Sequence, residues 1–331
     1  MKLEDSELRQ DVVSGDWILI APGRNRRPQE LKNKKKRKIV PKKGCIFENP
    51  QKSGNSAPII IEPDIKNWKI QVIHNKYPAL DHNGVVAVLG RQGPFFVIPG
   101  VGHHDLVITR DHNKNFPKLS KKEAEFVLHT FQRRYMSLKR DPYVSYVSIF
   151  HNWGLTAGAS IYHPHYQMIS MPVIPPDVEH SFAGSKRYFD SHHSCVHCDI
   201  IKWEAKEKKR IIYENRGAIA FAPFVSREPM EVRVFPKMHL PFFEDTKDTE
   251  LMYIADALQE ALRRIENKLN GPDYNFFIHT APVCNKSDFE HYHWHIEIRP
   301  KVDIEGGFEL STGMEINVID PDEAAKFLRG K

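Results

Sequence analysis

The stretch SIYHPHYQMISMP, residues 160–172, predicts a β-strand that presents polar side chains on one face. Successive strand residues point to opposite faces, so His163, His165 and Gln167 share one side and Tyr166 takes the other. Two imidazoles and an amide in a row indicate a site for binding or chemistry. On spacing alone, such a histidine pair is more often a metal site, or a pair of satisfied polar residues, than a nucleophile.

Length and composition predict a globular protein. The chain has 331 residues, of which 40% are hydrophobic, enough for a real core and for two domains. No run approaches the ~20 apolar residues of a membrane span, and the charged start MKLEDSELRQD is unlike a signal peptide. The cysteines, Cys45, Cys195, Cys198 and Cys284, are spaced for metal binding or burial rather than for a disulfide framework. We therefore expect a cytoplasmic protein with no membrane partner.

The positive charge is concentrated near the N-terminus. The net charge is +6, and much of the excess lies in LKNKKKRKIVPKK, residues 31–43. A solvated lysine-rich loop is the simpler interpretation of such a block. The alternative is a patch that attracts nucleic acid or a phosphorylated small molecule, and composition does not choose between them.

The helix and strand signals occur twice in the same order. An amphipathic helix begins at a capping box, Ser120 and Glu123, and a second runs from Asp248 to the stop at Gly271. Strands follow at 143–152 and 274–282, and each leads to a strand with alternating histidines. The second of these carries His291, His293, His295 and Glu297 on one face.

Equivalent landmarks in the two halves are equally spaced. The interval is 21 residues both from Pro142 to His163 and from Pro272 to His293, which indicates an internal duplication. We expect an α+β fold of two tandem halves, each a mostly antiparallel sheet with helices packed on one side and the H-x-H strand inside the sheet. The halves are assigned to 1–175 and 190–331, with the boundary around 175–194. A last helix should begin at Asp320 and cover the second sheet.

Each half also offers a potential set of metal ligands. The second-half set is Cys195, Cys198, His239 and His293. Zinc commonly takes four thiolate and imidazole ligands, two of them from a C-x-x-C turn. A redox pair or two buried thiols are the alternatives. A zinc finger is disfavoured because His239 lies too far beyond Cys198.

In the first half the corresponding set is Cys45, Glu48, His112 and His163, with a carboxylate in place of the second thiolate. Carboxylates can bind zinc, so a weaker zinc site or a site with another metal preference is one interpretation. A decayed site is the other. The sequence leaves the two equally open.

Several segments, in order along nearly the whole chain, resemble the galactose-1-phosphate uridylyltransferase family. This family is a duplicated branch of the histidine-triad superfamily, which also includes nucleoside-diphosphate-hexose phosphorylases. The matching segments are ELRQDVVSGDWILIAPGRNRRP (7–28), HNKYPAL (74–80), RDHNKNFPKLS (110–120), FHNWGLTAGASIYHPHYQ (150–167), YHWHIEIRP (292–300) and GGFELSTGMEINVIDPDEAAKFLR (306–329).

The resemblance implies that the face described first is catalytic. His165 would attack the α-phosphorus of a nucleotide sugar, hexose 1-phosphate would leave, and a second sugar phosphate would take the nucleotide from the histidine. Gln167 would donate an amide N–H to a phosphoryl oxygen. His163 would bind the first zinc. Attack requires a neutral imidazole whose other nitrogen has an acceptor, which the sequence does not identify.

The resemblance also implies roles for residues outside this strand. Arg24 and Arg27 would lie near the phosphates, Asn75 at the ribose or base, Asn152 and Ser160 at the phosphates, and Glu315 at the hexose hydroxyls. A homodimer is implied, with the active site near the interface and the C-terminal segment reaching the sugar.

Two positions depart from the family pattern. Tyr166 replaces a residue that is usually Gly or Ser, and Met314 stands where an aromatic is common. Alternation sends the Tyr166 ring away from the His165 face, into core space behind the strand. An irregular strand would instead let that ring narrow the pocket.

Three functions remain open. The first is a nucleotidyltransferase that moves UMP between a nucleotide sugar and hexose 1-phosphate. The second is an ADP- or UDP-hexose phosphorylase that uses inorganic phosphate, against which Glu315 counts mildly. The third is a zinc-containing nucleotide- or RNA-binding protein without turnover, motivated by the lysine run and Tyr166, although we do not expect nucleic acid as the main partner.

Overall fold

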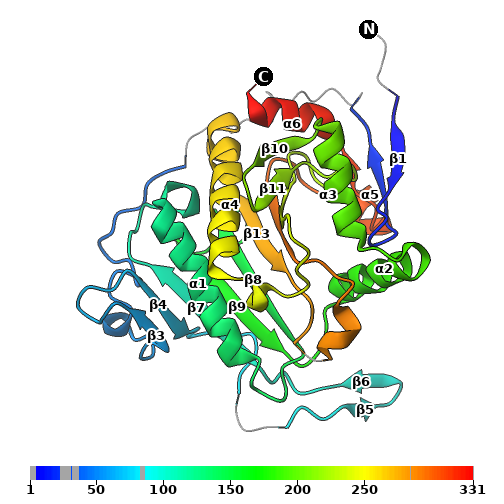
Figure 1. Ribbon diagram of the computed structural model, residues 1–331. Coiled ribbons are helices and arrows are strands. Elements are labelled where there is room, and N and C mark those ends of the chain that lie inside the picture. Colours follow the sequence, from blue (N-terminus) through cyan, green and yellow to red (C-terminus); the bar gives the residue numbers. More distant parts are fainter. Residues whose placement is uncertain (1–4, 23–30, 32–36, 83–85, 284, 331) are drawn as a thin grey trace.

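A ten-stranded sheet forms the centre of the molecule, which we describe from a computed structural model for residues 5–22, 31, 37–82, 86–283 and 285–330 (Figure 1). Its strand order is β10-β11-β12-β14-β13-β8-β9-β7-β4-β3, and all neighbours are antiparallel. The strands, in that order, are Ile211–Glu214, Ala218–Phe221, Val232–Pro236, His295–Pro300, Tyr274–His279, Tyr146–Trp153, His165–Met171, His103–Thr109, Ile70–His74 and Ile60–Glu62.

Two long helices pack on one face of this sheet, in front of it in Figure 1. They are α1 (Lys121–Leu138) and α4 (Asp248–Lys268), and their apolar stripes join the strands in one buried core. The predicted capping box is present: Glu123 N–H donates to Ser120 Oγ (3.3 Å), and Ser120 N–H donates to Glu123 Oε2 (2.8 Å). The two amphipathic helices are therefore confirmed.

Both H-x-H strands lie inside the sheet, as expected, but they begin later than the pattern predicts. β9 starts at His165 and β14 at His295, so His163 and His293 lie in the segments that enter the strands. In the first half Pro164 has no N–H to give to the ladder. In the second half the Trp294 N–H bonds the Leu240 carbonyl (2.9 Å), outside the sheet.

The two predicted halves share a single sheet, because β8 and β13 pair along its middle. The expected boundary region forms helix α2 (Pro176–His192). The division of the chain at residues 1–175 and 190–331 stays a prediction.

Helix α3 (Val196–Glu207) corrects the expectation that all helices lie on one side. Its residue Ile201 packs with Phe221 and Phe235, on the sheet face opposite α4. Strand alternation explains this, since Phe221 and Phe235 point away from the core beneath α4. The second half is thus covered by helices on both faces.

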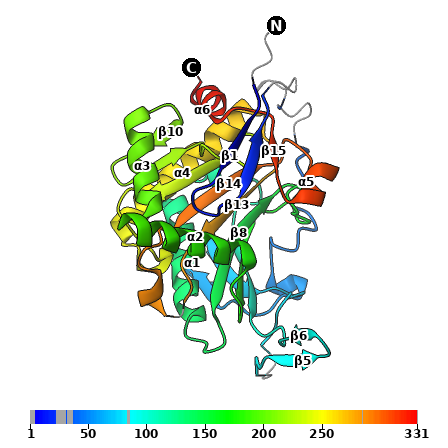
Figure 2. The same cartoon turned by 90° about the vertical axis from the view of Figure 1, so that its right-hand side faces the viewer.

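The chain ends pack together beside this half (Figure 2). β1 (Glu7–Gln10), β2 (Trp17–Ile20) and β15 (Ile316–Asn317) form a small sheet in which β15 runs parallel to β2. α6 (Pro321–Arg329) begins as predicted, with Asp320 accepting the Asp322 N–H (2.7 Å), and it packs beside β10 and α4. The remaining elements are α5 (Gly307–Thr312), the hairpin β5 (Gly90–Gln92) and β6 (Phe95–Val97), and short 3-10 helices at Gln51–Ser53, Phe116–Lys118, Phe243–Asp245 and Lys286–Phe289.

Within the described part of the chain, no helix combines the length and the apolar character that a membrane span requires.

Candidate functional site

The four first-half ligand candidates converge at the start of β9. His163 Nδ1 lies 3.3 Å from His112 Nδ1, 3.6 Å from Cys45 Sγ and 3.7 Å from Glu48 Oε1. Ligands on one tetrahedral metal are separated by roughly 3.3–3.6 Å. Glu48 Oε1 is also buried, without a hydrogen-bond partner among the described residues. A carboxylate oxygen that has no such hydrogen-bond partner and faces the two imidazoles fits a bound cation.

Both histidines of this set are oriented by backbone carbonyls. His112 Nε2 lies 2.8 Å from Val40 O, and His163 Nε2 lies 2.6 Å from Thr109 O. Each Nε2–H therefore donates to a carbonyl and leaves the Nδ1 lone pair for the cluster. Burial lowers the pKa of His163 to about 4, which keeps this imidazole neutral at neutral pH.

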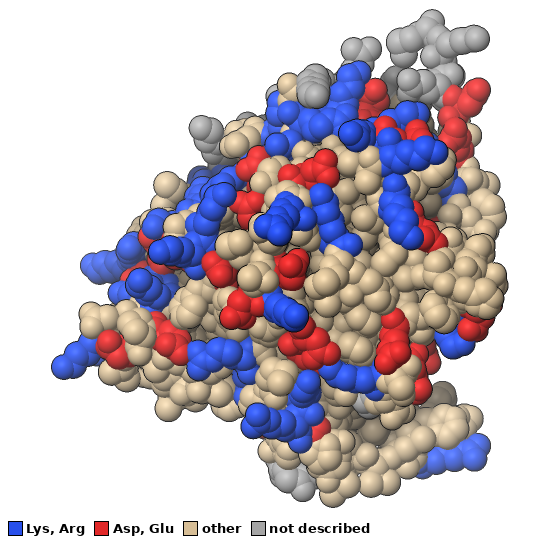
Figure 3. Space-filling view, viewed as in Figure 1, with Lys and Arg blue, Asp and Glu red and all other residues tan. Residues whose placement is uncertain are grey.

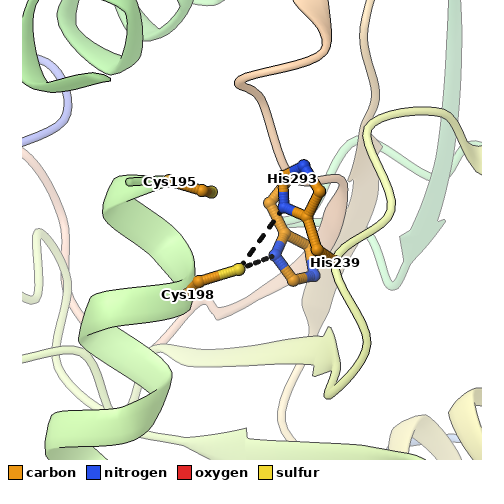
Figure 4. Close-up of side chains that lie close together, drawn as sticks. All are labelled: Cys195, Cys198, His239 and His293. Carbon is orange, nitrogen blue, oxygen red and sulfur yellow. Dashed lines mark hydrogen bonds between the residues drawn. The ribbon is translucent and has the colours of Figure 1, made fainter. Parts of the chain in front are cut away.

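The second-half candidates also meet at one point (Figure 4). Cys198 Sγ lies 3.4 Å from both His239 Nδ1 and His293 Nδ1, and Cys195 stands at the N-cap of α3, three residues before Cys198. The histidine Nε2–H groups again donate to carbonyls, of Glu290 (2.8 Å) for His239 and of Pro236 (3.0 Å) for His293.

The two thiols of this cluster affect each other's ionisation. Hydrogen bonding from the Cys198 thiol lowers the pKa of Cys195. The Cys195 sulfur in turn raises the pKa of Cys198. Two thiolates this close need a cation between them, and two sulfurs with two imidazoles form a donor set that suits a tetrahedral divalent metal.

His165 is the first residue of β9 and lies beside the first cluster. Its Nδ1–H donates to the His163 carbonyl (2.9 Å), which is the acceptor that the sequence did not reveal. Burial lowers its pKa, so the imidazole is neutral, and among the described residues Nε2 has no hydrogen-bond partner. The Phe47 ring lies 5.1 Å from the His165 ring. Because Phe47 lies between Cys45 and Glu48, the turn that carries these two ligand candidates also packs against His165.

Gln167 and Asn75 meet at a residue that the sequence analysis did not select, His104 on β7. His104 Nε2 lies 2.8 Å from Gln167 Oε1 and 3.1 Å from Asn75 Nδ2. Gln167 itself is half-buried on the His165 face of β9. The structure therefore brings together Asn75, His104 and Gln167, which come from three segments far apart in the sequence, and Gln167 shares its strand face with His165.

The other predicted residues are not joined to this group by a described contact. Asn152 Oδ1 accepts from Asn275 Nδ2 (2.9 Å), and Ser160 is exposed in the loop before β9. Glu315 Oε1 pairs with Arg227 (3.1 Å) next to the small terminal sheet. Arg24 and Arg27 lie outside the described residues.

The second half contains a copy of the His165 arrangement with one decisive change. His295 Nδ1–H donates to the His293 carbonyl (3.3 Å), but Glu297 replaces the glutamine. Glu297 pairs with Arg233 (3.2 Å) and Arg299 (3.0 Å). Burial acts against its ionisation, but the two guanidinium groups hold the pKa of Glu297 well below its usual range. A carboxylate here repels a phosphoryl group, so this copy is not equivalent to the first.

Tyr166 lies on the far side of β9, as alternation predicts. It is fully buried, with its ring 5.2 Å from Phe131 and 4.6 Å from His151. The ring fills the core under α1 and does not narrow the space in front of His165.

A separate cavity of 760 Å³ lies between β1 and α3. Trp203, Phe224 and Arg9 are among its lining residues, whereas His165, Gln167 and His104 are not. This cavity is therefore not part of the His165 site.

Two protein-family models and several proteins of known function match this chain. A model for galactose-1-phosphate uridyl transferase, N-terminal domain, matches residues 1–175, and a model for a domain of unknown function (DUF4921) matches residues 94–328. ADP-glucose phosphorylase of Arabidopsis thaliana is 33% identical over 331 residues, which cover 98% of this chain and 93% of that protein. The chain belongs to the galactose-1-phosphate uridylyltransferase family.

Other members of the family align over similar lengths. Galactose-1-phosphate uridylyltransferase of Thermotoga maritima is 26% identical over 336 residues and covers 98% of both chains. The crystal structure of the Arabidopsis ADP-glucose phosphorylase with bound ADP-glucose superposes with a TM-score of 0.84, at 30% identity, over 99% of each chain. A uridylyltransferase structure gives 0.75, at 25% identity, over 98% of this chain and 97% of that one.

Two site residues in this family member escaped the sequence analysis. His104 lies in GHHDLVIT, where alternation would have placed it on the His165 face once β7 was known to pair with β9. Phe47 lies between two ligand candidates and was not considered. Both omissions concern residues whose partners are distant in the sequence.

Proposed function

We propose that this protein transfers a nucleoside monophosphate from a nucleotide sugar to a phosphate-bearing acceptor through a nucleotidyl-His165 intermediate. The observation that carries this proposal is the hydrogen bond from His165 Nδ1–H to the His163 carbonyl (2.9 Å). It fixes the tautomer in which Nε2 keeps its lone pair, in a residue that burial holds neutral.

In the first step, Nε2 of His165 attacks the α-phosphorus. A phosphorus–nitrogen bond forms as the bond to the departing hexose 1-phosphate oxygen breaks, and no proton needs to move because that leaving group is already an anion. Gln167 donates its amide N–H to a phosphoryl oxygen, where charge increases in the transition state. In the second step, an acceptor phosphate oxygen displaces the histidine and regenerates neutral His165.

Both ligand sets are proposed as zinc sites. Bound zinc would act structurally, by holding together segments that are distant in the sequence. In the first half, Cys45, Glu48, His112 and His163 would anchor the start of β9 and the turn that carries Phe47. These protein groups would then keep the His165 ring in place. The need for reduced thiols is the basis for proposing a cytoplasmic location.

Two substrate pairs are candidates. UDP-glucose with galactose 1-phosphate follows from the family. ADP-glucose with inorganic phosphate is favoured by the 33% identity and the TM-score of 0.84 with the Arabidopsis phosphorylase, against 26% and 0.75 for uridylyltransferases. Glu315 counted mildly against a phosphorylase, because a carboxylate at this position is expected to bind hexose hydroxyls. Its pairing with Arg227 (3.1 Å) gives this carboxylate another partner and weakens that objection. We therefore take ADP-glucose and phosphate as the first pair to test.

A homodimer belongs to the same proposal. Within the described part of one chain, no contact connects Glu315 to His165 or Gln167. A second copy would supply the sugar-binding C-terminal segment that the family resemblance implies.

Non-catalytic binding of RNA is the competing proposal. Over the face that carries α1 and α4, Lys and Arg side chains are interspersed with Asp and Glu (Figure 3). Such mixing does not favour a polyanion on this face, because nucleic-acid sites concentrate basic residues.

Isotope exchange distinguishes these proposals. Labelled glucose 1-phosphate should enter ADP-glucose, or UDP-glucose, when enzyme and unlabelled nucleotide sugar are incubated without a second acceptor, as a double displacement requires. Product formation with phosphate and with galactose 1-phosphate then identifies the acceptor. No exchange with either donor, from protein that binds both, would contradict the proposal.

A further inference from the structure

The orientation of the Gln167 amide depends on His104. A glutamine side chain has nearly the same shape at its oxygen and at its nitrogen, but only the nitrogen can donate to a phosphoryl oxygen. In the reverse orientation the amide oxygen would face the phosphate and repel it. Something must therefore select one orientation.

The tautomer of His104 is set by the backbone. The Ala79 N–H donates to His104 Nδ1 (3.0 Å), so Nδ1 is an acceptor and the ring proton is on Nε2. His104 is 8% exposed, so this arrangement is shielded from solvent.

Among the described residues, the Nε2–H of His104 has one acceptor within reach. Gln167 Oε1 lies 2.8 Å away. Asn75 Nδ2 is also close, at 3.1 Å, but it is itself a donor, because the Asn75 oxygen accepts the Tyr77 N–H (3.1 Å). The oxygen of Gln167 is thus turned toward His104, and its NH₂ group is left for a ligand.

The sheet register places the two residues for this contact. In the β7–β9 pairing, Leu106 lies opposite Gln167 and His104 lies opposite Ile169. His104 is therefore the diagonal neighbour of Gln167 on the same face, within reach of a long side chain.

We propose that His104 is a positioning residue that fixes the Gln167 amide with its nitrogen toward the transferring phosphoryl group. This inference rests on the proposed function. His104 acts through Gln167 and needs no contact with the substrate. The donation from the Gln167 amide matters most when charge develops on the phosphoryl oxygens in the transition state. Loss of the His104–Gln167 hydrogen bond should therefore slow the transfer step more than it weakens donor binding.

The test is a double-mutant cycle on the single-turnover rate of His165 nucleotidylation, with ADP-glucose or UDP-glucose as donor. His104→Phe should slow this step about 10-fold or more and Gln167→Ala roughly 100-fold, with little change in donor affinity. The double variant should be no slower than Gln167→Ala, because His104 has nothing left to orient. His104→Gln, which restores a donor, should recover part of the rate.

His103→Phe is the matched control. This neighbouring histidine bonds Asp141 (3.0 Å) instead of Gln167, so the same substitution should leave the rate unchanged. If His104→Phe does not fold, His104→Leu supplies the same comparison. Independent, multiplicative effects of the two substitutions, or an unchanged rate in His104→Phe, would overturn the inference. Wild-type enzyme that is never nucleotidylated would instead refute the proposed function.

Discussion

At the scale of single residues, His151 shows how a buried imidazole makes stability depend on pH. Its Nδ1–H donates to the His165 carbonyl (2.8 Å), and its Nε2 is buried without a partner among the described residues. Burial lowers the pKa of His151 from 6.5 to about 3. Between these values the unfolded chain binds a proton that the folded chain does not, so the free energy of unfolding falls as the pH falls.

The slope expected from one such group is about 1.4 kcal/mol per pH unit. His151→Asn keeps a donor for the His165 carbonyl but does not titrate. Urea unfolding from pH 6.5 down to pH 4 should therefore show a shallower loss of stability in the variant than in the wild type. Parallel curves would show that His151 is not the group responsible.

The hydroxyl of Tyr166 contributes no hydrogen bond with the described residues in its buried position. Its Oη is buried without a partner among the described residues. Tyr166→Phe should leave nucleotide transfer unchanged and raise the free energy of unfolding by about 1 kcal/mol, since it removes an unsatisfied polar group. Tyr274→Phe is the control, because that hydroxyl accepts from Asn115 (3.4 Å) and its removal should not stabilise. Chemical denaturation of both variants measures the difference, and a destabilised Tyr166→Phe would mean that the hydroxyl has a partner in solution.

At the scale of elements, the turn at residues 45–48 connects the first set of ligand candidates to the proposed nucleophile, His165. Cys45→Ser and Cys195→Ser should each remove one metal equivalent and lower Tm by roughly 5–10 °C, because metal binding contributes folding free energy. Only Cys45→Ser should also slow nucleotidylation, since Phe47 lies 5.1 Å from His165. Metal analysis, thermal unfolding and single-turnover rates decide this, and equal slowing by the two variants would contradict a local role for the turn.

Sequence periodicity was sufficient to predict α1, α4, the antiparallel sheet and the interior position of both H-x-H strands. Local signals control these features: a capping box, an apolar stripe and side-chain alternation. The late start of β9 and β14 and the position of α3 were missed, because they depend on hydrogen bonds and burial between distant segments. His104 was missed for the same reason, since its contact with Gln167 arises only from the β7–β9 register.

At the scale of the whole molecule, Gln167 and Glu297 occupy corresponding positions in the two halves of the shared sheet. The first position requires a neutral amide, and the second requires a negative charge. Gln167→Glu should reduce nucleotidylation roughly 100-fold or more and leave the fold intact, because a carboxylate repels the phosphoryl group. Glu297→Gln should keep the activity but lower the free energy of unfolding by up to about 3 kcal/mol, because Arg233 and Arg299 lose a buried counter-charge. Paired rate and unfolding measurements test this, and loss of activity in Glu297→Gln at intact stability would mean that the second half takes part in catalysis.

The central claim is that His165 becomes covalently nucleotidylated. Intact-protein mass spectrometry after mixing with ADP-glucose, and separately with UDP-glucose, tests it when no acceptor is added. We predict a mass increase of one nucleoside monophosphate that maps to His165, is absent in His165→Asn and persists in the matched variant His295→Asn. An unmodified mass in protein that binds the nucleotide sugar, or a label on any other residue, would contradict the account.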